Sequence, residues 1–203
     1  MINIYGASGH AKVVLDIAKS INMEVVGVYD DNASLQQVSG FRIQQLLKGI
    51  KISNVIIAIG DNAIRKTIAQ EKVLTFAACL VHPSAQVGGG VFLGDGTVVM
   101  PNVVINNSAK IGKNCILNTA SVIEHDCELG DFVHLSPSAT LAGGVSVGEG
   151  THIGANAVII PGVKIGKWAV IGAGAVILRD IPDEAVVVGN PGKIIKYGKR
   201  NHG

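Results

Sequence analysis

The hydrophobic positions of the chain repeat with a period of six. An aliphatic residue occupies every sixth position from Val81 to Ile177 without a break. This period matches neither the turn of an α-helix nor the alternation of a hairpin, and it is typical of a parallel β-helix. Short strands each turn one aliphatic side chain inward, and three strands make one coil. The pattern predicts a prism of nearly six coils without an inserted loop. The period leaves the handedness open, although the usual rule for parallel crossovers favours a right-handed path.

A second set of positions holds small or β-branched residues four places after each aliphatic one. Cys115 and Cys127 belong to this set but fall on different faces, and Cys79 stands alone before the repeat. We therefore expect buried thiols without a disulfide bond, which favours an intracellular protein.

The first part of the chain alternates apolar strands with helical segments. The strands are expected at Ile2–Tyr5, Glu24–Tyr29 and Val55–Ile59, and helices at Ala11–Lys19 and after Asn62. This order predicts a parallel, Rossmann-like α/β sheet covered by helices. The expected organisation is an α/β domain at 1–78, a β-helix of hexapeptide repeats at 79–182, and a C-terminal cap with a basic tail at 183–203.

The carboxyl ends of these strands carry the candidate ligand-binding residues. They are Gly6–His10, Asp30 with Asp31, and Gly60–Asn62. In open α/β sheets ligands bind at these ends, and a glycine turn that opens a helix can hold a phosphate. Gly6-x-x-Gly9 lacks one glycine of the full dinucleotide motif, so an ordinary tight turn stays open. If a ligand binds, one nucleotide sugar fits this half-sized sheet better than a dinucleotide.

Charge and composition exclude several classes of partner. The 17 basic and 15 acidic residues nearly balance, which gives no reason to expect nucleic acid or an acidic membrane. No apolar run is long enough to span a bilayer, and the chain begins with a strand rather than a secretory signal. We expect a cytoplasmic protein without membrane insertion. Four positive charges in the tail either solubilise the chain end or approach a polyanion such as coenzyme A: Lys193, Lys196, Lys199 and Arg200.

Three of the six histidines are candidates for chemistry. His125 follows Ile123 by two positions, at an outward-facing corner between Glu124 and Asp126. The flanking carboxylates favour the imidazolium and make this histidine a candidate general base. His134 and His152 are eighteen residues apart, so they should be neighbours on adjacent coils. A metal would need a third ligand, which the pattern does not offer, and we expect no metal.

These motifs together resemble a known enzyme family. The motifs are Gly-Ala-Ser-Gly-His, Asp-Asp, Ile-Gly-Asp-Asn, the run from Asn118 to Asp126, and the closing Val188–Lys193. The chain resembles bacterial nucleotide-sugar N-acetyltransferases over essentially its whole length. It most closely resembles those that acetylate a UDP-4-amino-4,6-dideoxy sugar on the way to bacillosamine. Sialic acid O-acetyltransferase-like proteins and perosamine N-acetyltransferases are near relatives.

The resemblance implies a left-handed β-helix and a homotrimer with active sites between neighbouring prisms. The family's catalytic base matches His125. Its acidic neighbour, often glutamate, is Asp126 here, which keeps the charge but shortens the reach. Acetyl-CoA contacts of the family match His134, Gly143, Ala155 and Ala173. Nucleotide-sugar contacts match Ser8, Gly9, His10, Asp30, Asp31 and Gly60, with Asn118 near the sugar.

The residue types suit the implied chemistry. A sugar amine must lose a proton before it attacks a thioester, and a histidine beside a carboxylate can take that proton. We expect acetyl transfer from acetyl-CoA to a nucleotide-linked amino sugar, with UDP-4-amino-4,6-dideoxy-GlcNAc favoured. O-acetylation of sialic acid or another sugar and N-acetylation of GDP-perosamine are alternatives. A zinc carbonic anhydrase of the same helix type and a non-catalytic scaffold or nucleotide-sugar sensor are further alternatives.

Overall fold

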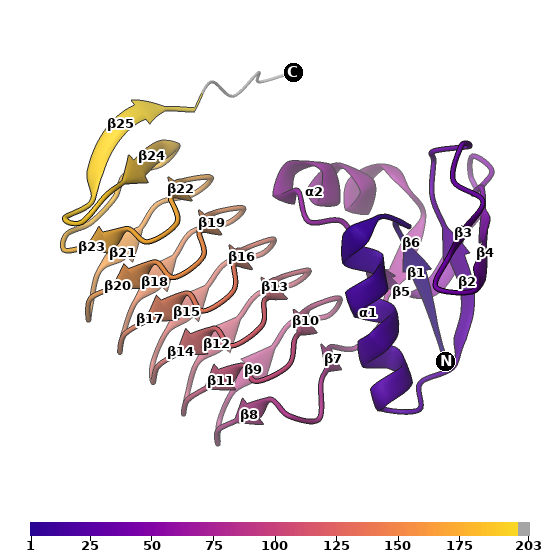
Figure 1. Ribbon diagram of the computed structural model, residues 1–203, viewed down its shortest axis with the longest axis horizontal. Helices are drawn as coiled ribbons and strands as arrows, with labels where there is room; N and C mark the ends of the chain where they lie inside the picture. The colour runs from indigo at the N-terminus through magenta and orange to yellow at the C-terminus, as the bar shows by residue number, and fades with distance from the viewer. Residues whose placement is uncertain (199–203) are drawn as a thin grey trace.

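The computed structural model describes residues 1–198, and it consists of an α/β part beside a triangular prism (Figure 1). The α/β part is built on a sheet in the order β3-β4-β2-β1-β5-β6, parallel except for the β3–β4 hairpin. Its strands are β1 (Ile2–Tyr5), β2 (Val25–Tyr29), β3 (Gln37–Val38), β4 (Phe41–Gln44), β5 (Ile52–Ile57) and β6 (Leu74–Phe76). Its helices are α1 (Gly9–Ser20) and α2 (Asn62–Glu71).

Alternation along the strands decides which helix each side chain meets. Ile4 and Ile56 are buried in one cluster with the apolar face of α1, whereas Tyr5 and Ile57 are buried in a second cluster with Ile68 of α2. Successive strand residues point to opposite faces of a sheet, so the two helices cover opposite faces. The parallel sheet predicted from the sequence is therefore confirmed, although β5 begins at Ile52 and ends at Ile57 rather than running from Val55 to Ile59.

The prism is a left-handed parallel β-helix with three faces, which are named here by their first strands. The β7 face holds β7 (Leu80–Val81), β10 (Val98–Val99), β13 (Ile116–Leu117), β16 (His134–Leu135), β19 (His152–Ile153), β22 (Val170–Ile171), β24 (Ala185–Val188) and β25 (Lys193–Tyr197). The β8 face holds β8 (Gln86–Val87), β11 (Val104–Ile105), β14 (Val122–Ile123), β17 (Thr140–Leu141), β20 (Val158–Ile159) and β23 (Val176–Ile177). The β9 face holds β9 (Phe92–Leu93), β12 (Lys110–Ile111), β15 (Glu128–Leu129), β18 (Ser146–Val147) and β21 (Lys164–Ile165).

The hexapeptide pattern accounts for the core of the prism. The aliphatic residues of the series are buried from Val99 to Ile177, and the small residues between them are buried as well. Cys115 and Cys127 are both buried free thiols, as predicted. The first coil differs, because Val87 is 44% exposed at the end of the prism where no further coil stacks beneath it. The β-helix and its register were thus predictable, whereas its left-handed sense opposes the usual crossover rule.

Each corner of the prism turns through a residue in the left-handed region. These residues recur every six positions and are mostly glycine, asparagine or serine, and Asp126 is one of them with a φ of 60°. Short polar side chains tolerate this conformation because they can bond locally. The turn fixes the direction in which the Asp126 side chain leaves the corner.

The α/β part docks on the corner between the β9 and β7 faces. Asn62 donates from Nδ2 to the carbonyl of Gly150 over 3.0 Å, and Arg65 donates to carbonyls of two lower coils. Lys66 forms an ion pair with Glu149 and lies 5.2 Å from the centroid of the Trp168 ring. The β7 face therefore lies against the α/β part, while α1 also contacts β7 (Figure 1).

Candidate active site

His125 stands on the corner that follows β14, between the β8 and β9 faces. Its side chain is 64% exposed, and its Nδ1 lies 2.8 Å from Oδ2 of Asp126. A carboxylate only accepts hydrogen bonds, so this contact places the ring proton on Nδ1 and leaves Nε2 free to take a proton. The shorter side chain of aspartate reaches the imidazole because the left-handed turn at Asp126 brings its carboxylate back toward the preceding residue.

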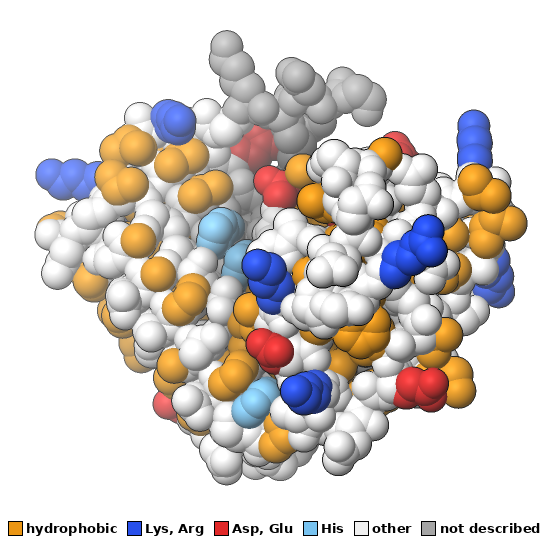
Figure 2. All heavy atoms as spheres, turned by 45° about the vertical axis from the view of Figure 1, so that its right-hand side comes forward, with side chains coloured by type: hydrophobic (Ala, Val, Ile, Leu, Met, Phe, Trp, Pro, Cys, Tyr) orange, Lys and Arg blue, Asp and Glu red, His pale blue; other side chains and the backbone are white. Residues whose placement is uncertain are grey.

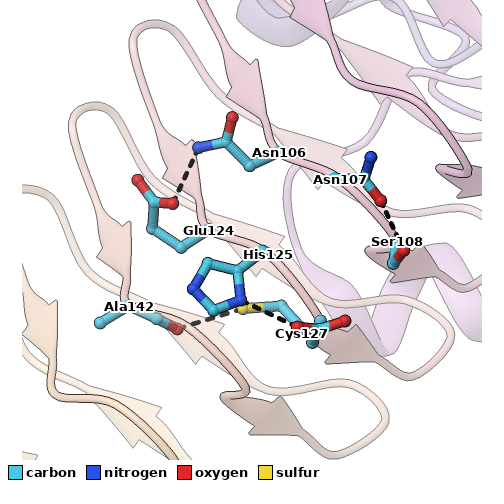
Figure 3. A network of polar contacts seen from close by, with 8 residues as sticks. Asn106, Asn107, Ser108, Glu124, His125, Cys127 and Ala142 are labelled. Atoms are coloured by element: carbon cyan, nitrogen blue, oxygen red, sulfur yellow. Dashed lines mark hydrogen bonds and ion pairs between the residues drawn. The ribbon is translucent and has the colours of Figure 1, made fainter.

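Gly143 lies directly beside the His125 ring on the next coil. A Cβ at this position would be 2.7 Å from both Cε1 and Nε2 of the imidazole, so only glycine leaves room for the ring. Among the described residues, no group accepts a hydrogen bond from the N–H of Gly143. Glu124 is held by the amide of Asn106, and the thiol of Cys127 bonds the carbonyl of Ala142 beneath the corner (Figure 3). His125 and Gly143, expected separately as the base and as an acetyl-CoA contact, therefore lie beside each other.

His134 lies on β16 at the junction with the α/β part. Its Nδ1 is 3.3 Å from the carbonyl of Gly60, and its Nε2 is 3.2 Å from Nδ2 of Asn118. The ring stacks on His152 with centroids 4.7 Å apart, as their spacing predicted. Burial first, and then His152 and Arg65, lower the pKa of His134 to about 3, so the ring is neutral at physiological pH. The structure thus brings Asn118, His134 and Gly60 together.

A pocket of about 520 Å³ opens beside this histidine pair. Histidine side chains come to the surface along the junction between the two parts of the molecule (Figure 2). The pocket is lined by Gly60, Asp61, Asn62, Ala63, His134, Gly150, His152, Trp168 and Val170. Its walls come from the start of α2 and from the β7 face, so a ligand there would touch both parts.

Ser8, Gly9 and His10 form the turn into α1. Ser8 occupies the N-cap position, but its side chain makes no capping hydrogen bond, and the first turn of α1 contains no acidic residue. Burial and the charge of Arg65 lower the pKa of His10 to about 4, and its buried Nε2 has no partner among the described residues. This helix end therefore has unused donors, as expected of a place that holds an anionic group.

Asp30 and Asp31 follow β2 but differ in their contacts. Both oxygens of Asp30 accept backbone N–H groups, from Ala7 and Asn32, each over 2.8 Å. Within residues 1–198, Asp31 accepts hydrogen bonds only at Oδ1, from the hydroxyl of Tyr5 at 2.6 Å and from the ammonium of Lys72 at 2.9 Å. These two hydrogen bonds lower the pKa of Asp31 despite some burial. Oδ2 of Asp31 remains open to a ligand, whereas the carboxylate of Asp30 shapes the turn that carries Ser8.

Ala155 and Ala173 lie one above the other on the corner between the β7 and β8 faces, where the N–H of Gly174 bonds the carbonyl of Ala155. This corner is separated from that of His125 by the whole width of the β8 face. Within one chain, the residues expected to contact acetyl-CoA therefore fall into separate groups. Arg65, which joins several of the groups at the junction, was not among the residues expected from the sequence.

The α/β part and the prism match two different family models. Residues 1–72 match the model of the PglD N-terminal domain, and residues 144–179 match that of the bacterial transferase hexapeptide (six repeats). A mutant of perosamine N-acetyltransferase from Caulobacter crescentus, in complex with CoA and GDP-perosamine, is 37% identical, with a TM-score of 0.90 and 96% of each chain covered. The chain belongs to the nucleotide-sugar N-acetyltransferases of the hexapeptide-repeat superfamily.

Two further proteins are similar to this chain. The acetyltransferase domain of PglB from Neisseria gonorrhoeae FA1090 is 34% identical, with a TM-score of 0.89 and coverage of 96% of this chain and 98% of that one. The uncharacterized protein L142 of Acanthamoeba polyphaga mimivirus is 30% identical over 103 residues, and the matched part is 21% of that protein, about a fifth of its length. Membership of the nucleotide-sugar N-acetyltransferases confirms the family that the sequence motifs indicated.

Residues 1–198 contain no group of three or more histidine, cysteine or acidic side chains that could hold a metal ion. No helix in this part of the chain is long and apolar enough to cross a membrane. Of the basic tail, Lys193 and Lys196 lie in β25, while Lys199 and Arg200 lie outside the described residues.

Proposed function

We propose that the protein transfers the acetyl group of acetyl-CoA to the amine of a nucleotide-linked amino sugar. The observation that carries this proposal is the exposed pair of His125 and Asp126, with the unbonded N–H of Gly143 beside it. A structural neighbour with 37% identity over 96% of the chain was solved with CoA and GDP-perosamine, which supports the same two substrates by class.

Each group on the corner has a role in this reaction. Nε2 of His125 takes a proton from the sugar amine, while Asp126 stabilises the imidazolium through Nδ1. Attack on the thioester builds negative charge on its oxygen, and the N–H of Gly143 is available to stabilise that oxyanion. Coenzyme A leaves as a thiolate, which needs little protonation because its thiol pKa is about 8.5. This scheme requires neither a metal nor a covalent enzyme intermediate.

The α/β part would hold the nucleotide sugar. The open start of α1, with Ser8, Gly9 and His10, suits a diphosphate, and Oδ2 of Asp31 suits an N–H or hydroxyl donor of the nucleoside. The amino sugar would then extend past Gly60 toward Asn118. UDP-4-amino-4,6-dideoxy-GlcNAc is the preferred acceptor by the sequence motifs, GDP-perosamine is the second candidate, and sialic acid or another sugar hydroxyl is the third.

The surface of the prism supports a homotrimer. The β7 face lies against the α/β part, and the β9 face exposes Lys110, Glu128 and Lys164. The β8 face instead carries no charged strand residue, and its outward positions are Gln86, Val104, Val122, Thr140, Val158 and Val176. An uncharged, β-branched face suits burial against a second copy of the chain, and a cyclic trimer would repeat this contact three times. It would also bring the corner of His125 from one subunit to Ala155 and Ala173 of the next.

A substrate panel tests the proposal directly. Purified protein and acetyl-CoA are incubated with UDP-4-amino-4,6-dideoxy-GlcNAc, GDP-perosamine and sialic acid, and the release of free coenzyme A is followed together with the mass of each sugar product. We expect acetylation of one nucleotide amino sugar. Turnover of sialic acid alone would replace N-acetylation by O-acetylation, and tight nucleotide-sugar binding without turnover would indicate a non-catalytic sensor.

A further inference from the structure

Arg65 is the largest fully buried side chain among the described residues, with 1% of its surface exposed. A guanidinium has five N–H donors, and all five are used. Nε donates to Asn114 O at 2.8 Å, Nη1 to Ile59 O at 2.9 Å and Gly60 O at 3.3 Å, and Nη2 to Asn62 Oδ1 at 2.8 Å and Phe132 O at 2.9 Å.

None of these acceptors is a carboxylate, so the buried charge is held by neutral oxygens alone. Burying a cation without an opposite charge in contact is costly, and apolar residues of similar volume often replace buried ions without loss of stability. Burial lowers the pKa of Arg65 to about 10, which still leaves it charged at neutral pH. A role in stability alone does not explain this arrangement, and the position of the acceptors indicates another one.

The acceptors join the two parts of the molecule at the candidate site. Two carbonyls belong to the turn after β5, at Ile59 and Gly60, and two belong to corners of the prism. The carbonyl of Gly60 also faces Nδ1 of His134. A carbonyl can only accept, so Nδ1 of that ring carries the proton and Nε2 must accept from the Asn118 amide.

We propose that Arg65 is a positioning residue for the acceptor sugar. It fixes the carbonyl of Gly60, and that carbonyl selects the Nδ1–H tautomer of His134. The Nε2 of His134 then orients Asn118, whose Oδ1 accepts the N–H of Thr119 at 2.9 Å. One N–H of the Asn118 amide remains free to meet the sugar. This last step rests on the proposed function, whereas the tautomer and its dependence on Arg65 do not.

The charge of Arg65 also disfavours protonation of the histidines at the junction. It contributes, after burial, to the lowered pKa values of His10, His134 and His152. Asp61 opposes it at His152. At His134, His152 and His10 also lower the pKa, and only the hydrogen bond to the carbonyl of Gly60 raises it. A neutral His134 is required, because a protonated ring has no lone pair to accept from Asn118.

Long-range ¹H–¹⁵N correlation spectra of the histidine rings test the tautomer without any substrate. We expect His134 to show a protonated Nδ1 and an unprotonated Nε2 from about pH 5 to 8, with the signals assigned by their loss in His134→Asn. A wild-type ring that is protonated at pH 7, or that carries its proton on Nε2, overturns the proposal whatever the variants do.

Variants then test the link to Arg65. In Arg65→Met, the preference of His134 for the Nδ1–H form should fall, and kcat should drop on the order of tenfold to a hundredfold while KM for the nucleotide sugar changes little. Lys66→Met is the matched control, because it removes a cation from the same helix and the same junction, and the partners of Lys66 are Glu149 and Trp168 rather than Gly60. It should leave both the His134 tautomer and kcat unchanged.

A purely structural role predicts a different result. Arg65→Met and Lys66→Met would then both lower the melting temperature, and neither would alter the His134 signals of the folded protein. Unchanged signals in folded Arg65→Met overturn the proposal. If that variant does not fold, Arg65→Lys replaces it, since lysine keeps a cation but cannot make five hydrogen bonds. Failure of the wild type to acetylate any sugar would sink the proposed function and leave this comparison intact.

Discussion

The proposed general base, His125, is oriented by contacts with Asp126 and Gly143 rather than by burial. Its ring is largely exposed, and it is held by the carboxylate of Asp126 on one side and by the backbone of Gly143 on the other. The left-handed turn at Asp126 compensates for the shorter side chain of aspartate. A general base can thus be oriented at an open corner, where two substrates are able to reach it.

Replacing the candidate base is the first prediction. His125→Ala should lower turnover with the amino-sugar acceptor by at least about a hundredfold, because proton removal from the amine loses its acceptor. Affinity for the nucleotide sugar, measured by calorimetry, should change little, since we propose that the α/β part holds most of that ligand. A variant with near-normal turnover from about pH 6 to 9 would contradict the assignment.

A second prediction concerns the contact beside the ring. Gly143→Ala places a methyl group 2.7 Å from Cε1 and Nε2 of His125, so the imidazole must move. We expect kcat to fall on the order of tenfold to a hundredfold with little change in melting temperature. Gly89→Ala is the matched control on the same column of corners, where the new methyl group meets only the end of the Asn107 side chain at 3.4 Å. Equal kcat values for the two variants would show that the His125 ring tolerates displacement.

At the scale of the elements, the sequence predicted what depends on local periodicity. The six-residue period identified the inward-facing residue of strands such as β14 and β16, and it placed His134 against His152 because residues eighteen apart must stack. The alternation of strands and helices located β1, and it located α1 to within two residues at its start. These features follow from a side-chain pattern that is repeated within a few residues.

The remaining features depend on contacts that leave no local pattern. In the sequence, nothing distinguishes Arg65 from the other polar residues of an amphipathic helix. Two of its partners are backbone carbonyls 49 and 67 residues away, and such contacts leave no local pattern. The short hairpin of β3 and β4 has too few residues to show alternation. The left-handed residues at the corners were detectable, since glycine, asparagine and serine recur there every six positions. The conformation of Asp126 could have been inferred from that column.

At the scale of the whole molecule, the junction concentrates neutral histidines. The pKa of His10 is lowered to about 4 and that of His134 to about 3, in both cases mainly by burial, and the pKa of His152 is lowered for the same first cause. In the unfolded chain these rings titrate near pH 6.5. The unfolded state therefore binds more protons than the folded state below that pH.

This difference gives the third prediction, a loss of stability in mild acid. The stability that depends on the neutral rings is fully present above about pH 6.5 and is lost as the pH falls toward the folded-state pKa values. The free energy of unfolding in urea should fall between about pH 7.5 and 5.5, by up to about 1.4 kcal/mol per pH unit for each such ring. His134→Asn should make this dependence shallower. A free energy that is constant or rises toward pH 5.5 contradicts the prediction.

The last prediction concerns the assembly, because a single chain does not bring its candidate groups together. His125 and Gly143 lie on one edge of the uncharged β8 face, and Ala155 and Ala173 lie on the other edge. Packing this face against a second copy in a cyclic trimer would pair one edge with the other in three equivalent clefts. We therefore expect each active site to take His125 from one subunit and Ala173 from its neighbour.

Mixing two inactive variants tests the shared cleft. His125→Ala removes the base, and Ala173→Trp fills the path expected for the pantetheine arm of acetyl-CoA. When the two proteins are unfolded together and refolded as mixed trimers, some clefts combine an intact His125 with an intact Ala173, and activity should return. Each variant refolded alone is the control and should stay inactive. Sedimentation that shows an active monomer, or the absence of any recovered activity at every mixing ratio, would establish that each site lies within one chain.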